Sequence, residues 1–560
     1  MARGDWWRQG VMYQVYPRSF QDTNGDGIGD LPGVTSRLDH LNDGTAGSLG
    51  VDAIWLSPFY PSPMADYGYD VADYCDVHPE YGTLADFDEM LRGAHERGIR
   101  VLVDFVPNHT SDRHPWFQAA RSSRTDPHRD WYVWRDPAPD GGPPNNWRSV
   151  FPAVGAAWTL DPTSGQYYLH SFLPQQPDLN WWNPEVRAAM HDVLRFWLDR
   201  GVDGFRIDVA HKMSRDPDLL DNPPEALDGR APAGVRRDED WPEVHVILRE
   251  FRKLLDAYDD RMAIGEVAVY EPERLVAYFG AGLDELHLVF NFSFLEQPWR
   301  AEAFRDSVDR YERLLAPGAW PVYTLANHDN PRARSRYEEA PEGDGCDGPG
   351  ALATAGWART GAGGAGSVET VGMRRARVAA TMLLTLRGTP FLYYGEEIGQ
   401  ADGAVPPERV VDVHGRDPER TPMQWDGTAG AGFTTGRPWL PIGSEAPVVN
   451  VAAQRDDPRS LLSLYRRLAW LRKGSAALRS GSYRSAGEVP GVFSYVREAD
   501  GERVLVALNF RAVPAALNVG SLGLPGTGDL RLSTLPDRAP GSVSLAPLEL
   551  GPDEGVIVWL

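Results

Sequence analysis

The sequence predicts an α/β fold, a closed (β/α)8 barrel with an inserted subdomain after the third strand and an antiparallel β-sandwich at the C-terminus. Eight short runs rich in β-branched and aromatic residues occur along the chain, and helical patterns separate most of them, which indicates parallel βαβ units. After about residue 478, short alternating runs separated by Gly and Pro replace the helical pattern. The length of 560 residues also exceeds what one compact core accommodates.

The predicted strands alternate with amphipathic segments, of which residues 184–200 are the clearest. Asn183 can cap this helix, Pro184 suits its first position and Gly201 can end it. Between the two, apolar residues recur at helical spacing. The strands are expected at residues 11–16, 53–56, 101–105, 204–207, 262–265, 288–292, 322–325 and 391–394.

Two long segments interrupt this alternation. Residues 108–178 are rich in Pro, Trp, Asn and Asp, which predicts an inserted subdomain, because a loop between a strand and a helix is rarely so long. Residues 340–370 are rich in Gly and Ala, which predicts a mobile surface loop. The expected organisation is therefore barrel (1–107), insertion (108–178), barrel (179–478) and C-terminal β-sandwich (479–560).

Charge and composition exclude several classes of partner. The formal net charge of −23 argues against binding to nucleic acid or to membrane surfaces, because both bind proteins through basic surface patches. No apolar run is long enough to span a bilayer, and no secretory signal is recognisable. With only Cys75 and Cys346, two free thiols are expected in a reducing cytosol. We expect a cytoplasmic protein, either a monomer or a small homo-oligomer.

Acidic residues recur where predicted strands end. Asp208 ends the fourth strand, Glu266 ends the fifth and Asp329 follows the seventh. Reactive groups of a (β/α)8 barrel lie at this edge, and the convergence of three acids argues against ordinary surface carboxylates. Basic residues and imidazoles are expected at the same depth, namely His109, Arg206 and His328.

Two such carboxyl groups suit glycoside hydrolysis, in which one attacks the anomeric carbon and its protonated partner donates to the leaving oxygen. Retention of configuration requires them to be about 5–5.5 Å apart. Arg206, two residues before Asp208, should keep that carboxylate ionised by charge pairing. Glu266 must instead hold a proton, for which Asp208 and Asp329 could supply like-charge neighbours.

These residues lie in four segments that resemble the signature regions of the α-amylase family, glycoside hydrolase family 13. The segments are DFVPNHT (104–110), GFRIDVAH (204–211), GEV (265–267) and NHDN (327–330). The resemblance covers nearly the whole chain. It implies that Asp208 is the nucleophile, Glu266 the acid/base and Asp329 the residue that stabilises the transition state. It also implies sugar binding by His109, Arg206 and His328, without an organic cofactor.

Further segments resemble one group within the family. QPDLN (176–180) is similar to the marker of the oligo-1,6-glucosidase group, and in MADYGYD (64–70) the resemblance assigns Asp66 and Tyr69 to the glucose pocket. Arg420, in RTPMQW (420–425), would pair with Asp66 and block longer chains, with Arg416 as the alternative partner. Val209, the residue after the nucleophile, bears on the choice between α-1,4 and α-1,6 linkages. Hydrolysis of α-1,4 linkages in maltose-type glucosides, with some breadth of substrate, is favoured.

The segment from Asp22 to Asp30 places oxygen atoms at alternate positions, as in the first half of an EF-hand loop, but its twelfth position is Gly33 rather than Glu. A polar turn without metal is the alternative. The resemblance implies a structural Ca²⁺ site here. Its expected ligands are Asp22, Asn24, Asp26, the carbonyl of Ile28 and Asp30.

The leading hypothesis is thus a retaining exo-α-glucosidase that acts on short α-glucosides. A transglucosylase or sugar isomerase of the trehalose or isomaltulose synthase type would share the glycosyl-enzyme intermediate. Arg332 and Arg334, which follow NHDN, leave this alternative open. A non-catalytic amylase-like partner protein is disfavoured, because all three acids are present.

Overall fold

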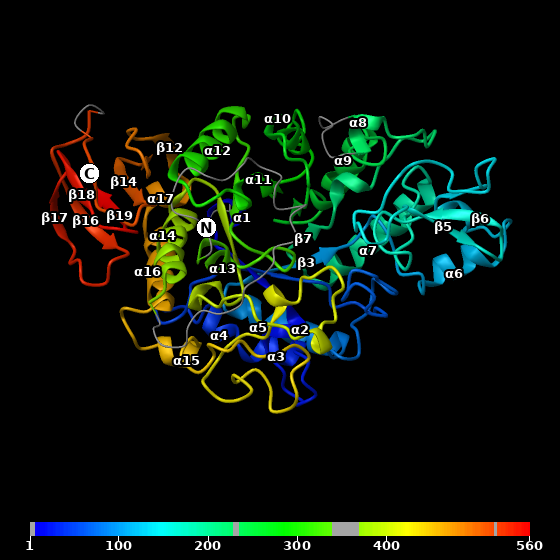
Figure 1. Cartoon of the computed structure of the whole chain (residues 1–560), viewed down its shortest axis with the longest axis horizontal. Coiled ribbons are helices and arrows are strands. Elements are labelled where there is room, and N and C mark those ends of the chain that lie inside the picture. Colours follow the sequence, from blue (N-terminus) through cyan, green and yellow to red (C-terminus); the bar gives the residue numbers. More distant parts are fainter. Residues whose placement is uncertain (1–5, 228–234, 339–368, 520–522) are drawn as a thin grey trace.

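A computed structural model describes residues 6–227, 235–338, 369–519 and 523–560. Figure 1 shows the chain as an elongated body with the C-terminal strands at one end, a strand-containing insertion at the other and the barrel between them. The predicted mobile loop at 340–370 falls almost entirely outside the described residues, as does Cys346, and Cys75 is a free, half-buried thiol.

Eight parallel strands form the barrel sheet. Hydrogen-bonded neighbours follow the order β10-β11-β1-β2-β3-β7-β8-β9, so among the described residues β9 and β10 border the seam. In the lumen, the ring of Phe290, directly after β9, lies 4.9 Å from that of Phe391 on β11. The strands are β1 (Met12–Val15), β2 (Ala53–Leu56), β3 (Arg100–Phe105), β7 (Gly204–Ile207), β8 (Met262–Gly265), β9 (Leu288–Val289), β10 (Val322–Thr324) and β11 (Thr389–Tyr393).

Alternation along the strands sorts side chains into an interior and an outer layer, because successive residues of a strand face opposite sides. Met12 and Ala53 belong to one buried cluster that contains residues from seven of the eight strands, β7 being the exception, and this cluster fills the lumen. Their neighbours Tyr13 and Ile54 belong to the larger cluster beneath the helices. The prediction of a (β/α)8 barrel is confirmed.

Most barrel helices lie where helical periodicity predicted them. Helix α7 covers Pro184–Arg200 as expected, with the Asn183 side chain accepting from the Glu185 N–H and Gly201 in the left-handed conformation (φ 105°). The other long helices are α5 (Leu84–Glu96), α9 (Glu243–Leu255), α12 (Ala301–Leu314), α14 (Val371–Thr385) and α16 (Leu461–Gly474).

The predicted sixth strand at 288–292 is too long. Only Leu288–Val289 is extended, and helix α11 (Phe292–Leu295) begins at the end of the predicted range. The Asn291 side chain accepts a hydrogen bond from the Phe294 N–H, so it caps the helix and stops the strand. The apolar run in the sequence could not by itself distinguish a strand from a helix at these residues.

The segment between β3 and β7 contains helix α6 (Pro115–Ser122) and an antiparallel sheet of β4 (Trp134–Arg135), β6 (Gln166–Leu169) and β5 (Trp158–Asp161). Its sheet extends away from the barrel in Figure 1. It remains tied to the barrel mouth through the isolated bridge between His109 and Asp178.

The C-terminal strands form a six-stranded and a two-stranded antiparallel sheet, as the alternating runs predicted. One face of the larger sheet shares an apolar cluster with the smaller sheet, and the other face, with Phe493 and Tyr495, joins the core beneath the barrel helices. The strands are β12 (Ser482–Ser485), β13 (Val492–Ala499), β14 (Glu502–Asn509), β15 (Ala515–Leu517), β16 (Thr527–Ser533), β17 (Gly541–Ser544), β18 (Leu548–Leu550) and β19 (Gly555–Trp559).

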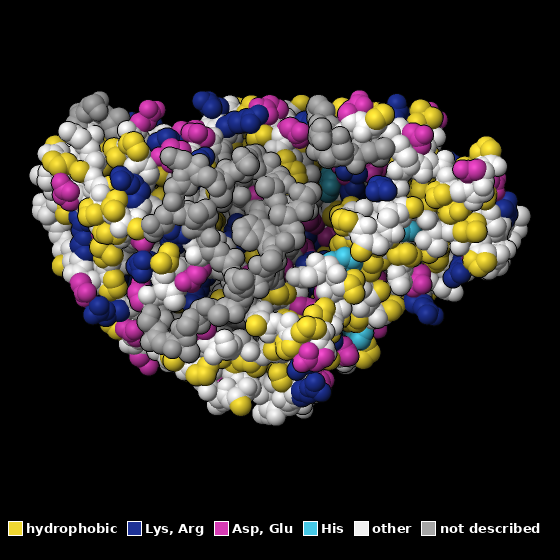
Figure 2. Space-filling model, viewed as in Figure 1, with side chains coloured by type: hydrophobic (Ala, Val, Ile, Leu, Met, Phe, Trp, Pro, Cys, Tyr) yellow, Lys and Arg dark blue, Asp and Glu magenta, His cyan; other side chains and the backbone are white. Residues whose placement is uncertain are grey.

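The molecular surface carries mixed charge. On the face drawn in Figure 2, the Lys and Arg side chains of described residues are scattered among acidic ones and form no broad basic patch. Within the described ranges, no helix has the length and apolarity that crossing a membrane requires.

The N-terminal end of the barrel is closed by an ion-pair cluster around Asp203. Its buried carboxylate is bonded by His95 (2.7 Å), Arg100 (2.7 Å) and the Val101 N–H (2.9 Å). Burial acts to raise the pKa of Asp203, but its ion-pair and hydrogen-bond partners outweigh it, so the pKa is lowered.

Replacing Asp203 by Asn should therefore destabilise the fold by about 3 kcal/mol at pH 7, because it breaks a buried ion-pair cluster. A lowered folded-state pKa contributes stability above the unfolded-state value of about 4, and this contribution is lost as pH falls through the folded-state pKa. Urea unfolding at pH 7 and pH 3 should show the difference between wild type and variant shrinking in acid. Asp192→Asn, which breaks an exposed pair with Arg195, is the control, and equal effects of the two variants would contradict the assignment.

Candidate active site

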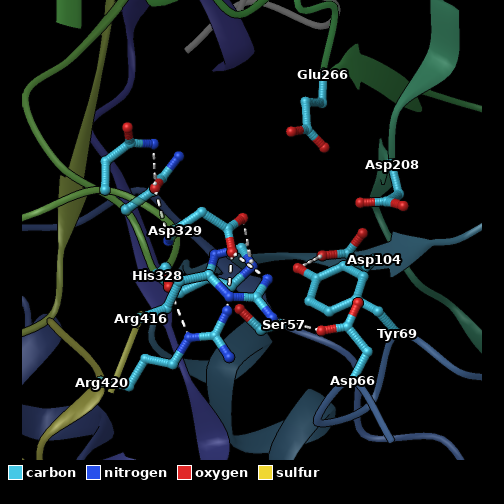
Figure 3. A network of polar contacts seen from close by, with 12 residues as sticks. Ser57, Asp66, Tyr69, Asp104, Asp208, Glu266, His328, Asp329, Arg416 and Arg420 are labelled. Atoms are coloured by element: carbon cyan, nitrogen blue, oxygen red, sulfur yellow. Dashed lines mark hydrogen bonds and ion pairs between the residues drawn. The ribbon is translucent and has the colours of Figure 1, made fainter. Parts of the chain in front are cut away.

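Polar side chains replace apolar ones in the barrel lumen near the carboxyl ends of the strands. Gln14, Asp104 and Arg206 occupy positions two residues after lumen-facing Met12, Leu102 and Gly204, respectively, so alternation carries them into the lumen. Asp208 and Glu266 follow directly where β7 and β8 end. Figure 3 shows that Asp208, Glu266 and Asp329 point towards one common space.

The guanidinium of Arg206 joins three carboxylates. It donates to Asp208 (2.6 Å) and Asp104 (2.8 Å) through Nη1, and through Nη2 to Glu266. Because Asp208 and Glu266 bond neighbouring nitrogens of one guanidinium, their carboxyl groups lie close together. The Trp55 ring beneath this guanidinium, 4.9 Å from its carbon atom, excludes water from that side.

Burial dominates the ionisation of Asp208. It raises the pKa of this carboxyl well above its ordinary value, Arg206 acts against the increase, and the charges of Glu266 and Asp104 add to it. The predicted ion pair with Arg206 is therefore present, but charge pairing does not set the direction of the shift. Burial likewise raises the pKa of Asp104 to about 6. Such close carboxyl groups titrate as a set rather than singly.

Val209 positions Glu266 with its backbone. Its N–H donates to Glu266 Oε2 (3.2 Å), and its own φ is +35°, a left-handed conformation that β-branched residues rarely adopt. The strain is maintained by the surrounding hydrogen bonds, including the Ala210 N–H to the Glu266 carbonyl (2.9 Å). The side chain of Val209 is itself buried.

Asp329 lies opposite the Asp208–Glu266 pair (Figure 3). Its Oδ1 accepts from Arg420 (2.8 Å) and Arg416 (3.0 Å), and its Oδ2 contacts His328 Nε2 (3.1 Å). Burial acts to raise the pKa of Asp329, but these neighbours lower it well below its usual range. Asp329 is therefore ionised at neutral pH.

The predicted pairing of Asp66 with Arg420 is wrong. Arg416 donates to Asp66 (2.6 Å) and also to Asp412 (2.9 Å), so it sits among three carboxylates. Arg420 is instead buried and donates to Asp329 and the His328 carbonyl (2.7 Å). A 3₁₀ turn, Pro418–Arg420, follows Arg416 and ends with Arg420. The two arginine side chains therefore lie at different depths.

The other predicted sugar-binding residues line the same pocket. Tyr69 donates to Asp104 (3.0 Å) and stacks on His328 at 5.2 Å. His109 contacts the Tyr69 carbonyl and Gln176, each at 3.1 Å. Burial lowers the pKa of both His109 and His328, so both rings are neutral at pH 7.

An aromatic contact joins the insertion to the loop after β11. The rings of Phe151 and His414 stack at 3.6 Å, and the Arg416 guanidinium lies 5.4 Å from the Phe151 ring. Phe172 continues the row from Phe151 towards His109. This row closes the pocket beside the Asp66–Arg416 pair.

The sequence interpretation missed several residues of the site. Gln14 bonds His328 (2.8 Å) and is a polar residue within an apolar strand, which was a usable signal. Asp104 and Gln176 begin the DFVPNHT and QPDLN segments, yet neither was singled out. Phe151 and His414 carried no recognisable signal, because their contact depends on how two distant loops meet.

The predicted calcium loop is ordered by its own hydrogen bonds. Asp22 accepts from the N–H groups of Asn24 (3.0 Å), Gly25 (2.8 Å) and Gly27 (2.9 Å). Asn24 and Asp26 each accept from the N–H two residues later, at 2.8 Å. Asp30 caps the following helix through Gly33. In the described part of the chain, no three acidic, His or Cys side chains gather into a metal-binding group.

The arrangement unites a buried carboxyl pair, a third ionised carboxylate and a pocket whose far end is closed by an ion pair. Such a site can attack an anomeric carbon, donate a proton to the leaving oxygen and stabilise positive charge on a sugar ring.

Comparison with known proteins agrees with this geometry. The family model for the alpha amylase catalytic domain matches residues 14–343 and 362–481. The chain is 41% identical over 531 residues to a probable alpha-glucosidase of Rhizobium meliloti, covering 90% of this chain and 89% of that one. It is 39% identical over 545 residues to the oligo-1,6-glucosidase of Parageobacillus thermoglucosidasius, covering 90% of each.

A solved structure extends the match to nearly the full length. The trehalulose synthase MutB of Pseudomonas mesoacidophila superposes with a TM-score of 0.86 at 36% identity, covering 99% of each chain. Sequence signatures, barrel, site geometry and relatives lead to one assignment, and the chain belongs to the α-amylase family, glycoside hydrolase family 13.

Proposed function

We propose that the protein is a retaining exo-α-glucosidase that releases glucose from the non-reducing end of short α-glucosides by double displacement. The observation that carries the proposal is the buried Asp208–Glu266 pair on one guanidinium, opposite ionised Asp329. In the reacting form of the site Asp208 is the carboxylate, paired with Arg206, and it attacks the anomeric carbon while Glu266 protonates the leaving oxygen. Glu266 then takes a proton from the water that hydrolyses the glycosyl–enzyme bond.

Of the two carboxyl groups, that of Glu266 is the more open to solvent. The Glu266 side chain is 16% exposed, more than that of Asp208 at 7%, which suits a group that exchanges protons with the leaving sugar and then with water. Neutral His328 and His109 suit hydrogen bonding to sugar hydroxyls, and Tyr69 offers an aromatic ring to the sugar face. The relatives named as glucosidases support hydrolysis as the outcome.

A sugar isomerase of the trehalulose synthase type is the second candidate, favoured by the similarity to MutB. Arg332 and Arg334, which left this alternative open, are buried and committed elsewhere. Arg332 donates to the Tyr394 carbonyl (2.6 Å), and Arg334 to the Gly399 carbonyl (2.6 Å) and Glu445. Since neither guanidinium is available to an acceptor sugar, the arrangement favours water as the acceptor.

Structural calcium at the 22–30 loop is part of the proposal. Its support is the alternate spacing of the Asp22, Asn24 and Asp26 oxygens, whose side chains fold back over the loop. Gly27 (φ +93°) lets the loop pass the Arg437 carbonyl, where a Cβ would lie 1.8 Å away. The bound ion would link the loop to the start of helix α3 (Leu31–Ser36) and contribute stability rather than chemistry.

Asp208→Asn should lower kcat for maltose at least about 10³-fold without changing the fold, because the amide cannot form the glycosyl ester. Glucose should be released from wild type as the α-anomer, which proton NMR resolves at early times. Asp199→Asn on the exposed face of α7 is the matched control. Release of the β-anomer, or retained activity of Asp208→Asn, would refute the mechanism.

Arg416→Met should lower kcat/KM for maltose about 10²-fold, because it leaves buried Asp66 and Asp412 unpaired at the sugar-binding end. It should also allow cleavage of a maltooligosaccharide blocked at its non-reducing end, which wild type rejects. Arg416→Lys keeps the positive charge but not the planar guanidinium, so its kcat/KM should lie between those of wild type and Arg416→Met. Unchanged kinetics in Arg416→Met would show that this pair does not define the pocket.

Removing calcium with EGTA should lower the thermal midpoint by several degrees, and added Ca²⁺ should restore it, because an ion bound only to the folded state stabilises that state. The Asp26→Ala variant should have a low midpoint that neither treatment changes. If EGTA leaves the wild-type midpoint unaltered, the hydrogen bonds within the loop suffice and the calcium assignment fails.

A further inference from the structure

A second cavity lies where the inserted segment joins the barrel, at the side of the molecule that carries the β4–β6–β5 sheet (Figure 1). Its walls come from residues 130–135, 179–182 and 213–219, and they include none of Asp66, Asp208, Glu266 and Asp329. It offers about 80 Å³ to the centres of water molecules. One water needs about 10–15 Å³, so the cavity can hold a ligand larger than a single water.

One wall of the cavity is an exposed and fixed aromatic ring. Trp182 is 41% exposed, which is unusual for a large apolar side chain. Its indole N–H donates to the Arg215 carbonyl (3.3 Å), and its backbone N–H bonds the Asn180 side chain (3.2 Å). A flat ring held in one orientation at the mouth of a polar cavity suits the apolar face of a pyranose.

The remaining walls offer hydrogen-bonding groups. Asp130 and Asn180 lie beside Trp182, and Asn180 is oriented by its bond to the Asp130 carbonyl (2.9 Å). Trp134 also lines the cavity, and its buried indole N–H has no hydrogen-bond partner among the described residues. Buried donors are normally satisfied, so this group indicates a polar ligand.

The faces of the Trp134 ring are already covered. Phe117 stacks on it at 5.6 Å, and the Arg129 guanidinium lies 3.4 Å from its centre. The edge of the Trp134 ring, which carries the N–H group, therefore remains for contact with a ligand in the cavity.

Charge favours a neutral ligand over a phosphorylated one. Asp130 and Arg135 bring opposite charges to the lining, and the Asp216 carboxylate is paired with Arg237 (2.7 Å), so the lining has no excess of positive charge. The Arg215 guanidinium is committed to Asp178 and to Asn108 (2.9 Å), so it is not available to a phosphate.

We propose that this cavity is a second carbohydrate-binding site, which accepts one neutral pyranose such as glucose on Trp182. The sugar class rests on the proposed function, whereas the site itself rests on the cavity. Its back wall is close to the active site, because Arg215 bonds Asn108, whose amide contacts His109 (3.1 Å).

The test is calorimetric titration of the full-length Glu266→Gln protein, which cannot turn substrate over, with glucose and with maltose. We expect two classes of binding event, and Trp182→Ala in the same background should weaken the second at least 10-fold while the first remains. Trp470→Ala is the matched control, since the Trp470 indole also donates to a backbone carbonyl (Ser48, 3.1 Å) but lies on α16. Asp130→Asn, which replaces an exposed side chain and leaves the core intact, should weaken the second event in the same way.

A single binding event in the Glu266→Gln protein, or equal effects of Trp182→Ala and Trp470→Ala, would overturn the proposal. The second-site proposal and the glucosidase proposal can fail independently of each other. Glucose release by wild type without a Trp182-dependent event would refute only the second site. Glucose binding that depends on Trp182, in a protein that releases no glucose, would refute only the glucosidase.

Discussion

The site depends on one buried cation, the guanidinium of Arg206. Three carboxyl groups, those of Asp104, Asp208 and Glu266, meet in the lumen of the barrel, where desolvation would drive them to the neutral form. Arg206 supplies the charge that lets them lie together, and its planar donors fix their positions. Lysine could supply the charge but not this geometry, because its single ammonium group does not bond several planar partners at fixed angles.

The barrel makes this concentration of charge tolerable. Lumen positions nearer the N-terminal ends are filled by apolar side chains such as Met12 and Leu102, and the Trp55 ring gives the arginine a rigid, dry floor. The polar residues Gln14, Asp104 and Arg206 stand at later lumen positions, where the pocket opens. The strained backbone of Val209 belongs to the same arrangement, since it directs an N–H at Glu266. Stability is thus concentrated below the site, and the reactive groups are held above it.

A second cation, Arg416, closes the pocket from the opposite end. It joins Asp66, Asp329 and Asp412, which come from loops far apart in the sequence. The two arginines divide the acids into a reactive set and a sugar-holding set. Burial raises the pKa of Asp208 in the first set, whereas the pKa of Asp329 in the second is lowered despite burial, because more positive charge surrounds it.

The sequence by itself determined the barrel, the strand-end acids and the family, because alternation, capping residues and short signatures are local patterns that survive without coordinates. Helix 184–200 shows this best, since its cap and first proline act within the first turn and its terminal glycine acts within the last. Only the tertiary structure decided that Asp66 pairs with Arg416 rather than Arg420, that His414 stacks on Phe151, and that Arg332 and Arg334 are buried. These contacts join segments more than 60 residues apart, whose meeting depends on how loops pack and not on any local pattern.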